Sequence, residues 1–372
     1  MKILHVVNSL DPGGMENGVV NMARALEPRG FEIHVACLER RGAFADRLPH
    51  PGRVTVLGKS RGFSPHAALR LAAEITRLRP AVLHSHNLGA LIYASLATGG
   101  GRRGALIQGE HSQLTDDELT PRRLRQRRWL YRACRAVHTV SHPMRDELLA
   151  LGFSAEKISV IPNGVDTAHF TPGDRRAARR ALGQPADAVC IGIVGRFGPY
   201  KRHAVLLDAF DEIAARFPAA HLIIAGIGGS EEPAIRDRAQ AGPHAARIHW
   251  LGFQSDPRAC YQALDLLAIP SVNEGLSNVA LEAMSSGVPA LANLGCGHEH
   301  IITAGLDGVI ADLATPAALA AQLTALLAQP GRLVDFGQKA RTKMTARFSI
   351  ACMADAYASL YRAAITPPPH HR

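Results

Sequence analysis

Short apolar runs alternate along the chain with longer segments in which apolar residues recur every three or four positions. An apolar run of about four to eight residues, bounded by Gly, Pro or polar residues, is typical of a buried strand. Such runs predict strands at 2–8, 32–37, 53–57, 81–86, 105–108, 137–140, 157–161, 189–194, 221–225, 247–251 and 264–269. The segments between them, such as 65–79 and 204–216, have the periodicity of amphipathic helices. Strands that alternate with helices through short connections form parallel sheets, so the predicted fold class is α/β.

The alternating pattern occurs twice, which predicts two Rossmann-like, doubly wound domains. The first set of strands ends near residue 161, and the second begins at Val189. A chain of 372 residues is also long for a single hydrophobic core. We therefore expect one domain at 1–165 and a second at 166–347, with an Arg-rich linker region at 167–185.

The C-terminal part of the chain carries only helical patterns. After the strand at 264–269 we expect helices at 316–327 and 333–347, and no further strand. A last amphipathic helix is predicted at 348–365, and the Pro- and His-rich tail 366–372 is expected to be disordered.

The stretch 271–287 combines a strand end, a polar loop and a helix start. Good helix formers occupy 279–284, and Ser277 or Asn278 is a natural N-cap. Free backbone N–H groups and the positive end of the helix dipole would face the same point, which is the arrangement of an anion site.

Two glutamates flank this predicted anion site. Glu274 lies in the loop and Glu282 lies about one turn inside the helix. Because carboxylates accept hydrogen bonds from hydroxyl groups, the layout suits a polyhydroxylated ligand joined to a phosphate, as in a nucleotide sugar. The alternative is a surface loop with two solvated glutamates, since such loops follow most strands of α/β proteins.

Two strand ends of the first domain carry candidate binding residues. Gly13 and Gly14 follow the first strand, where the absence of a Cβ lets backbone approach a phosphate; a tight structural turn is the alternative. Glu110 and His111 follow the strand at 105–108, and ligands of open α/β sheets bind at such carboxyl ends. The alternative for His111 is a polar surface residue.

Two cations follow the first strand of the second domain. Arg196 offers a fork that can grip phosphate oxygens, and Lys201 offers a compact point charge. Two solvated side chains are the alternative. No Asp-x-Asp motif and no His/Cys set at ligand spacing is found in the sequence, so no metal site is expected.

The amino-acid composition favours a globular protein with an anionic partner. The hydrophobic content of 47% with 20% charged residues is that of a globular protein, and a net charge of +10 favours an anionic partner. Six cysteines without a Cys-x-x-Cys motif suggest inert thiols in a reducing compartment. No signal-peptide pattern or membrane-length apolar run is found, so we expect a cytoplasmic protein.

A basic run at 121–135 interleaves cations with apolar and aromatic residues. Its candidate contacts are Arg122, Arg123, Arg125, Arg127, Arg128 and Trp129. A basic helix with interfacial aromatics suits an anionic membrane, which predicts peripheral attachment at the inner face of the membrane near a lipid-linked acceptor. The alternative is a solvated helix whose aromatics pack inward. Nucleic acid is not expected, because no nucleic-acid-binding motif accompanies the charge.

The segment from Glu274 to Ala290 resembles the signature of a known family. Its sequence, Glu-Gly-Leu-Ser-Asn-Val-Ala-Leu-Glu-Ala-Met-Ser-Ser-Gly-Val-Pro-Ala, is similar to that of the retaining GT-B glycosyltransferases of family 4, glycosyl transferases group 1. The pair Arg196 and Lys201 matches a second motif of that family. The resemblance runs from Lys2 to about Arg362, and the first domain looks most similar to bacterial exopolysaccharide-system sugar transferases. It implies two domains facing each other across a cleft, with the helix 348–365 crossing back to the first.

The resemblance also implies roles for individual residues. Arg196 and Lys201 would hold the donor diphosphate, Glu282 the ribose, and Glu274 the transferred sugar. Backbone near Gly275, Leu276, Ser277 and Asn278 would meet the diphosphate, with Gly13 and Gly14 closing over it. His111 would lie beside the donor sugar, and Gly226 and Phe253 at the edge that binds the base.

The function that follows is transfer of a hexosyl group from a nucleotide sugar, with retention, to a glycan or lipid-linked acceptor. The expected setting is exopolysaccharide or cell-envelope glycan synthesis. Cationic side chains would replace a divalent ion, so no cofactor or metal is expected. Two rivals remain open: a sugar-nucleotide epimerase of similar fold, and a protein that only binds a nucleotide sugar.

Overall fold

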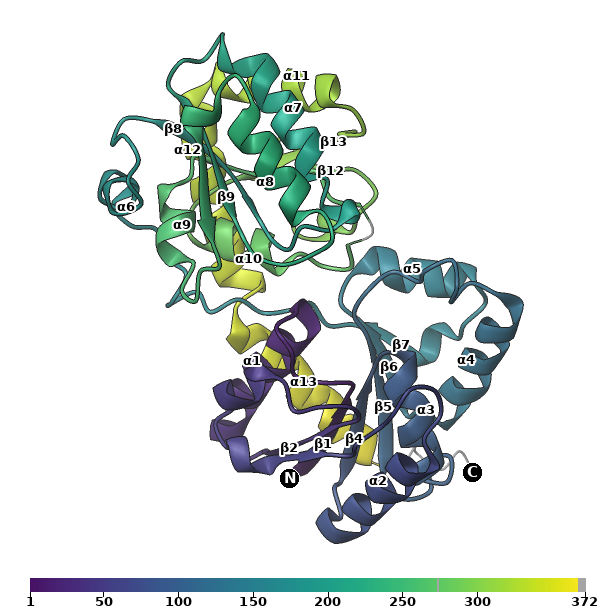
Figure 1. Ribbon diagram of the computed structural model, residues 1–372. Helices are drawn as coiled ribbons and strands as arrows, with labels where there is room; N and C mark the ends of the chain where they lie inside the picture. Colours follow the sequence, from purple (N-terminus) through teal and green to yellow (C-terminus); the bar gives the residue numbers. More distant parts are fainter. Residues whose placement is uncertain (273, 367–372) are drawn as a thin grey trace. The chain divides into compact units, whose positions relative to one another are not determined.

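The computed structural model describes residues 1–272 and 274–366, which divide into two compact units. Unit 1 consists of Met1–Gly164 with the chain from Ile350, and unit 2 consists of Val165–Ser349. Asn273 and the predicted tail beyond Thr366 lie outside the described residues. Each unit has its own parallel sheet, covered by helices (Figure 1).

Unit 1 is built on a seven-stranded sheet in the order β3-β2-β1-β4-β5-β6-β7. Its strands are β1 (Lys2–Val7), β2 (Glu32–Cys37), β3 (Val54–Val56), β4 (Val82–His86), β5 (Ala105–Glu110), β6 (Ala136–Thr139) and β7 (Ile158–Val160). Its helices are α1 (Gly14–Leu26), α2 (Pro65–Leu78), α3 (Asn87–Ala97), α4 (Pro121–Ala133), α5 (His142–Ala150) and α13 (Ile350–Ile365). The strands are buried on both faces because helices cover both faces.

Helix α13, from the far end of the chain, belongs to unit 1 and packs beside α1 (Figure 1). Its side chains Tyr357 and Tyr361 are fully buried against the sheet. The ion pair between Arg29 and Asp355 ties the exposed side of the helix to the turn that follows α1. The amphipathic pattern at the end of the sequence thus completes the core of the unit that contains the first residues of the chain.

Unit 2 has a six-stranded parallel sheet in the order β10-β9-β8-β11-β12-β13. Its strands are β8 (Val189–Val194), β9 (Ala220–Ala225), β10 (Ile248–Gly252), β11 (Leu266–Ile269), β12 (Ala290–Asn293) and β13 (Gly308–Ala311). Its helices are α6 (Arg175–Ala181), α7 (His203–Ala214), α8 (Glu232–Ala241), α9 (Arg258–Ala263), α10 (Asn278–Ser285), α11 (Pro316–Leu327) and α12 (Pro330–Arg347).

Two predictions for unit 2 were wrong. Strands β12 and β13 lie where only helices were expected, because four-residue strands rich in Ala and Gly lack a clear apolar run. The predicted linker contains helix α6, which Asp174 caps through the Ala177 backbone. Arg175 and Arg179 of this helix both pair with Asp265, so α6 is fastened to the residue that precedes β11.

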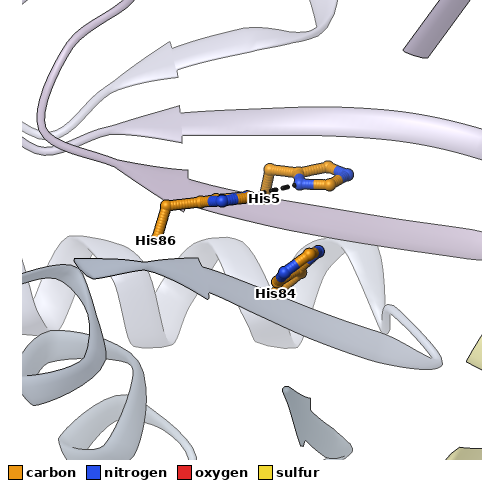
Figure 2. Close-up of side chains that lie close together, drawn as sticks. All are labelled: His5, His84 and His86. Atoms are coloured by element: carbon orange, nitrogen blue, oxygen red, sulfur yellow. Dashed lines mark hydrogen bonds between the residues drawn. The ribbon is translucent and has the colours of Figure 1, made fainter. Parts of the chain in front are cut away.

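A layer of histidines lies inside unit 1, on the sheet face that α1 and α13 cover. His5 of β1 is in register with His84 of β4, and His86 lies two residues further along β4 on the same face. Figure 2 shows these three rings gathered between the two strands. His138 of β6 joins the layer across Gly109, where a Cβ would lie 2.7 Å from the His138 ring. Glycine therefore makes room in β5 for the neighbouring rings.

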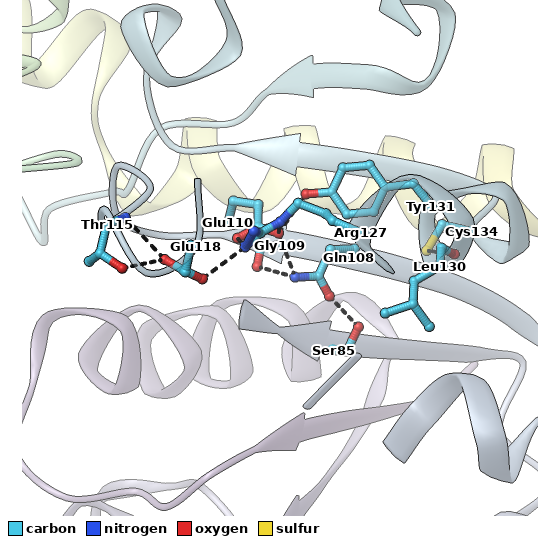
Figure 3. Close-up of polar contacts among 10 residues, drawn as sticks. All are labelled: Ser85, Gln108, Gly109, Glu110, Thr115, Glu118, Arg127, Leu130, Tyr131 and Cys134. Atoms are coloured by element: carbon cyan, nitrogen blue, oxygen red, sulfur yellow. Dashed lines mark hydrogen bonds and ion pairs between the residues drawn. The ribbon is translucent and has the colours of Figure 1, made fainter. Parts of the chain in front are cut away.

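A buried ion-pair network holds the end of β5 (Figure 3). The Glu110 carboxylate accepts from Nε and Nη2 of Arg127, each at 3.4 Å, and from the Tyr131 hydroxyl at 2.5 Å. Arg127 also donates to Glu118 at 3.0 Å, and Gln108 donates to Glu110 at 3.1 Å. Glu110, which was predicted to follow the strand, is the last residue of β5, and its carboxylate is taken up by this structural network beside His111.

The same network corrects part of the predicted membrane surface. Arg127 is fully buried, so it cannot contact a lipid headgroup as predicted. Its place in the helix turns it inward, towards Glu110, while Arg122, Arg123, Arg125, Arg128 and Trp129 of the same helix are exposed. Tyr131 packs inward, as the alternative reading of this helix had it, but Trp129 is 62% exposed.

Substituting Arg127→Met is expected to destabilise the folded chain by about 3–5 kcal/mol, because Glu110 would keep a buried charge without its cation. The matched control is Arg125→Met on the exposed side of α4, for which we expect a change within about 0.5 kcal/mol. Urea unfolding followed by circular dichroism measures both. An R127M variant as stable as R125M would show that the Glu110 network does not support the fold.

Candidate active site

Loops from three strands of unit 2 pack against one another at the carboxyl ends of the sheet. Gly226 has φ +146°, and a Cβ there would lie 1.9 Å from the carbonyl oxygen of Gly195. Gly229, with φ +112°, packs in the same way on the Phe197 carbonyl. The Val272 amide donates to the Tyr200 carbonyl at 2.8 Å, which joins the loop after β11 to the loop after β8. Only glycine allows this close backbone contact.

Lys201 and Glu274, predicted from separate motifs, form an ion pair in this loop cluster. Their side chains are only 15% and 13% exposed. Burial alone would raise the pKa of the Glu274 carboxyl, but the charge and hydrogen bond of Lys201 outweigh it, and the pKa is lowered. The pair therefore stabilises the fold above the ordinary carboxyl pKa, and this contribution is lost as pH falls through the lowered value.

Helix α10 begins beside this pair, as predicted. Ser277 is its N-cap, and the Ser277 side chain accepts from the Ala280 backbone N–H. Glu282, in the second turn, accepts a hydrogen bond from the Tyr261 hydroxyl at 2.6 Å. Tyr261 was missed in the sequence because a tyrosine at helical spacing reads as an ordinary core residue. Here it orients one oxygen of the Glu282 carboxylate.

The other candidate residues of unit 2 lie around the same loops. Arg196 is exposed, whereas Gly275 and Leu276 are buried. The Gly226 amide donates to the Gly252 carbonyl at 2.9 Å, which brings Gly226 next to Phe253, a side chain that is 59% exposed. The two residues predicted for the base edge are thus neighbours, and whether they bind a base stays a prediction.

The loop after β12 was also missed. Gly297, with φ +77°, packs so closely that a Cβ would lie 2.6 Å from the Gly275 carbonyl oxygen. Its neighbour His298 is fully buried, and the Glu274 and His298 side chains interact electrostatically. A Gly-x-Gly spacing at 295–297 was the available signal, but it is weak without knowledge that this loop follows a strand.

In unit 1, the glycine pair after β1 forms the start of a helix. Gly13 is the N-cap of α1, and Gly14 is its first residue. Both residues are exposed. Gly13 is in extended backbone that any residue adopts, and a Cβ there would meet only the end of the flexible Glu16 side chain, which can move aside.

His111 follows β5 and joins the histidine layer at its partly exposed end. Its Nε2 lies 2.8 Å from Nδ1 of His86, and Nε2 of His86 lies 2.9 Å from Nδ1 of His5. Burial lowers the pKa of His111 to about 4 and, with the nearby His111 ring, that of His5 to about 3. The rings are therefore neutral at physiological pH.

The histidine layer corrects the expectation that no His set comes together at ligand spacing. His5, His84 and His86 each offer a nitrogen, and these atoms lie within 4.8 Å of one another. Two nitrogens on one zinc ion are about 3.4 Å apart in a tetrahedral site with bonds of about 2.1 Å. The His5 and His86 nitrogens are 2.9 Å apart and share a hydrogen, so their geometry is that of a hydrogen bond.

Each half of the chain matches the model of a known protein family. The family described as Glycosyltransferase Family 4 matches residues 12–169, and Glycosyl transferases group 1 matches residues 174–343. D-inositol 3-phosphate glycosyltransferase 2 of Catenulispora acidiphila is 27% identical over 97% of this chain and 92% of its own length. The D-inositol 3-phosphate glycosyltransferase of Geodermatophilus obscurus is 30% identical over 86% of this chain and 78% of its own.

Comparison of structures gives the same fold. Anabaena HepE, in a crystal structure with UDP-glucose, superposes with a TM-score of 0.85 at 22% identity, covering 98% of this chain and all of HepE. The predicted GT-B fold and the family resemblance are thereby confirmed. This chain belongs to the family 4 glycosyltransferases, GT-B enzymes that take the transferred sugar from a nucleotide-sugar donor.

Proposed function

We propose that this enzyme transfers a hexosyl group from a uridine diphosphate sugar to a hydroxyl group of an anionic acceptor, with retention. HepE, whose structures hold UDP or UDP-glucose, supports the choice of donor base. The names of the relatives support a phosphorylated cyclitol, D-inositol 3-phosphate, as the first acceptor to test. A net charge of +10 suits a phosphorylated acceptor.

The observation that carries the proposal is the pairing of Lys201 with Glu274 beside the start of helix α10. The Lys201 ammonium has three hydrogens, so it can hold Glu274 and still donate to a phosphate. The Glu274 carboxylate can accept from sugar hydroxyls, and the Glu282 carboxylate, oriented by Tyr261, can accept from the ribose. One cluster of loops thus offers a partner for each part of a nucleotide sugar.

The roles of these groups in the reaction follow from the position at which negative charge develops. The bond between the anomeric carbon and the diphosphate oxygen breaks, and the charge on the diphosphate grows. Arg196, Lys201 and the N-terminus of α10 stabilise this charge. The acceptor hydroxyl attacks the face that the diphosphate leaves, and its proton passes to the departing phosphate oxygen. Because two cationic side chains and a helix end supply the positive charge, we expect transfer without a divalent ion.

The remaining roles stay predictions: His111 beside the donor sugar, and the Gly13–Gly14 backbone at the diphosphate. An epimerase or a simple binding protein would use the same donor groups without an acceptor. Products distinguish these rivals from a transferase, because only transfer or hydrolysis separates the sugar from the nucleotide.

Incubation with UDP-glucose and D-inositol 3-phosphate is expected to release UDP faster than incubation with the donor alone. Coupled detection of UDP, with mass spectrometry of the acceptor, measures the transfer. The same assay is repeated with other nucleotide sugars, and with EDTA to remove divalent ions. An altered sugar on an intact nucleotide would indicate epimerisation, and binding without turnover for every donor and acceptor would contradict the proposal.

Removing either partner of the central ion pair should reduce turnover while the chain still folds. We expect Lys201→Met to lower kcat by about 10²–10³-fold, the usual effect of losing one group that stabilises transition-state charge. Glu274→Gln is expected to lower kcat as well, because a neutral amide accepts hydrogen bonds from sugar hydroxyls more weakly than a carboxylate. The control is Lys339→Met, which breaks an exposed ion pair with Asp335 on α12. Near wild-type turnover in K201M would contradict the assigned role.

A specific observation favours a second, lipid-linked acceptor. Helix α4 exposes five arginines and Trp129 on its surface. A hollow of about 590 Å³ opens beside its first turn, lined by Asp117, Thr120, Arg122, Arg123 and Gln126. Cations around a hollow, with an exposed indole nearby, suit the headgroup region of an anionic membrane. Among the described residues, no helix has the length and apolar character needed to span a bilayer.

Flotation tests this surface directly. The chain is expected to float with vesicles that contain phosphatidylglycerol and to remain below with neutral vesicles. A triple variant, Arg122→Gln, Arg125→Gln and Trp129→Ala, should lose flotation, at about 1 kcal/mol per arginine. The matched control replaces Arg236, Arg258 and Arg332, three partly or fully exposed arginines of unit 2. Equal flotation of the two triple variants would overturn the membrane proposal.

A further inference from the structure

The backbone at Arg202, the residue after Lys201, has a conformation that residues with side chains rarely adopt. Its φ of +59° and ψ of +40° lie in the left-handed region. Only Arg79, Asn87 and Arg202 have a positive φ among the described residues other than glycine. Arg202 stands between the short turn Pro199–Lys201 and helix α7. A right-handed conformation here would continue the turn into the helix, so Arg202 separates Lys201 from α7.

The Arg202 guanidinium reaches the loop after β13. Its Nη1 donates to the Leu313 carbonyl at 3.4 Å, and its Nη2 donates to the carbonyl of Ala314. Leu313 is fully buried in the hydrophobic core of unit 2, so this loop is a fixed anchor. Residues with side chains stay in strained backbone regions where the surrounding contacts outweigh the strain. The two bonds of the guanidinium supply such contacts at Arg202.

Asn293, the last residue of β12, connects the same loop to the loop after β11, which carries Glu274. Its Oδ1 accepts from the Leu313 backbone N–H at 2.9 Å, and its Nδ2 donates to the Ser271 carbonyl at 3.3 Å. The Asn293 side chain is buried, so water does not compete for these bonds. The loops that carry Lys201 and Glu274 are therefore both fastened to the loop after β13.

We propose that Arg202 and Asn293 are positioning residues that set the place of Lys201 relative to Glu274. The proposal rests on the proposed function, in which this ion pair binds the donor. Each side chain holds one of the two loops that carry the pair, and neither residue was a candidate in the sequence. Precise placement matters, because a displacement of about 1 Å at a reacting group can lower a rate by about 10²-fold.

The variant Arg202→Gly separates the role of the backbone from that of the side chain. Glycine adopts a positive φ without strain, so R202G should fold, but it loses both bonds to the loop after β13. We expect its kcat for UDP release to fall about tenfold, with less change in the KM for UDP-glucose. Arg202→Lys, which can still donate to one carbonyl, should keep more of the turnover than R202G.

The matched control is Arg79→Gly. Arg79 also has a positive φ, of +49°, but it ends helix α2 in unit 1. We expect R79G to keep the kcat of the wild-type enzyme. A wild-type kcat in R202G would overturn the positioning role, because the backbone conformation alone would then be sufficient.

Hydrogen exchange, followed by mass spectrometry, tests the coupling without an assay of transfer. The Val272 amide donates to the Tyr200 carbonyl at 2.8 Å, so its exchange reports whether the loops after β8 and β11 stay joined. We expect this amide to exchange about tenfold faster in R202G and in Asn293→Ala than in the wild-type enzyme, and at the wild-type rate in R79G.

The two measurements separate this inference from the proposed function. Unchanged exchange of the Val272 amide in R202G would refute the coupling, whatever the activity of the variant. A wild-type enzyme that released no UDP from any donor would overturn the proposed function. Faster exchange in R202G would in that case still show that the Arg202 side chain holds the two loops together.

Discussion

The ion pair between Lys201 and Glu274 is the contact on which the candidate site depends. It joins the ends of β8 and β11, two adjacent strands at which the order of the sheet reverses direction. Crevices of doubly wound sheets open at such points, because the connections leave on opposite faces. The pair keeps a carboxylate ionised in a largely buried place and leaves a cation beside a helix N-terminus. A donor with both hydroxyl and phosphate groups matches that combination.

In unit 1 the buried polar groups at the corresponding point of the sheet are neutral histidines. Its sheet reverses between β1 and β4, the two strands that carry His5, His84 and His86. Neutral imidazoles that are hydrogen-bonded to one another cost less to bury than charged groups would. The charge that is buried nearby, on Glu110, is matched by Arg127 and by the Tyr131 hydroxyl. The strand end that carries His111 is thereby held on both sides.

Most of the strands could be predicted from the sequence, and each prediction that was wrong has a physical reason. Most strands were found because both faces of a parallel sheet are apolar, which produces uninterrupted runs. Strands β12 and β13 were not predicted, because short strands that contain Ala and Gly have little periodicity. Arg127 was predicted to lie on the surface because its neighbours in the sequence are basic. It is buried because it pairs with the buried Glu110 carboxylate. Tyr261 and His298 gave no signal, since their partners are distant in the sequence.

The sequence by itself determined the fold class, the family and the residues that match its motifs, because these depend on local pattern and spacing. Only the tertiary structure decided which side chains meet. It paired Lys201 with Glu274 across 73 positions and His5 with His86 across 81. Such pairs depend on strand order and register, which bring together residues whose separation along the chain carries no pattern. The protonation of the buried histidines follows from those contacts, since burial and hydrogen-bond partners set it.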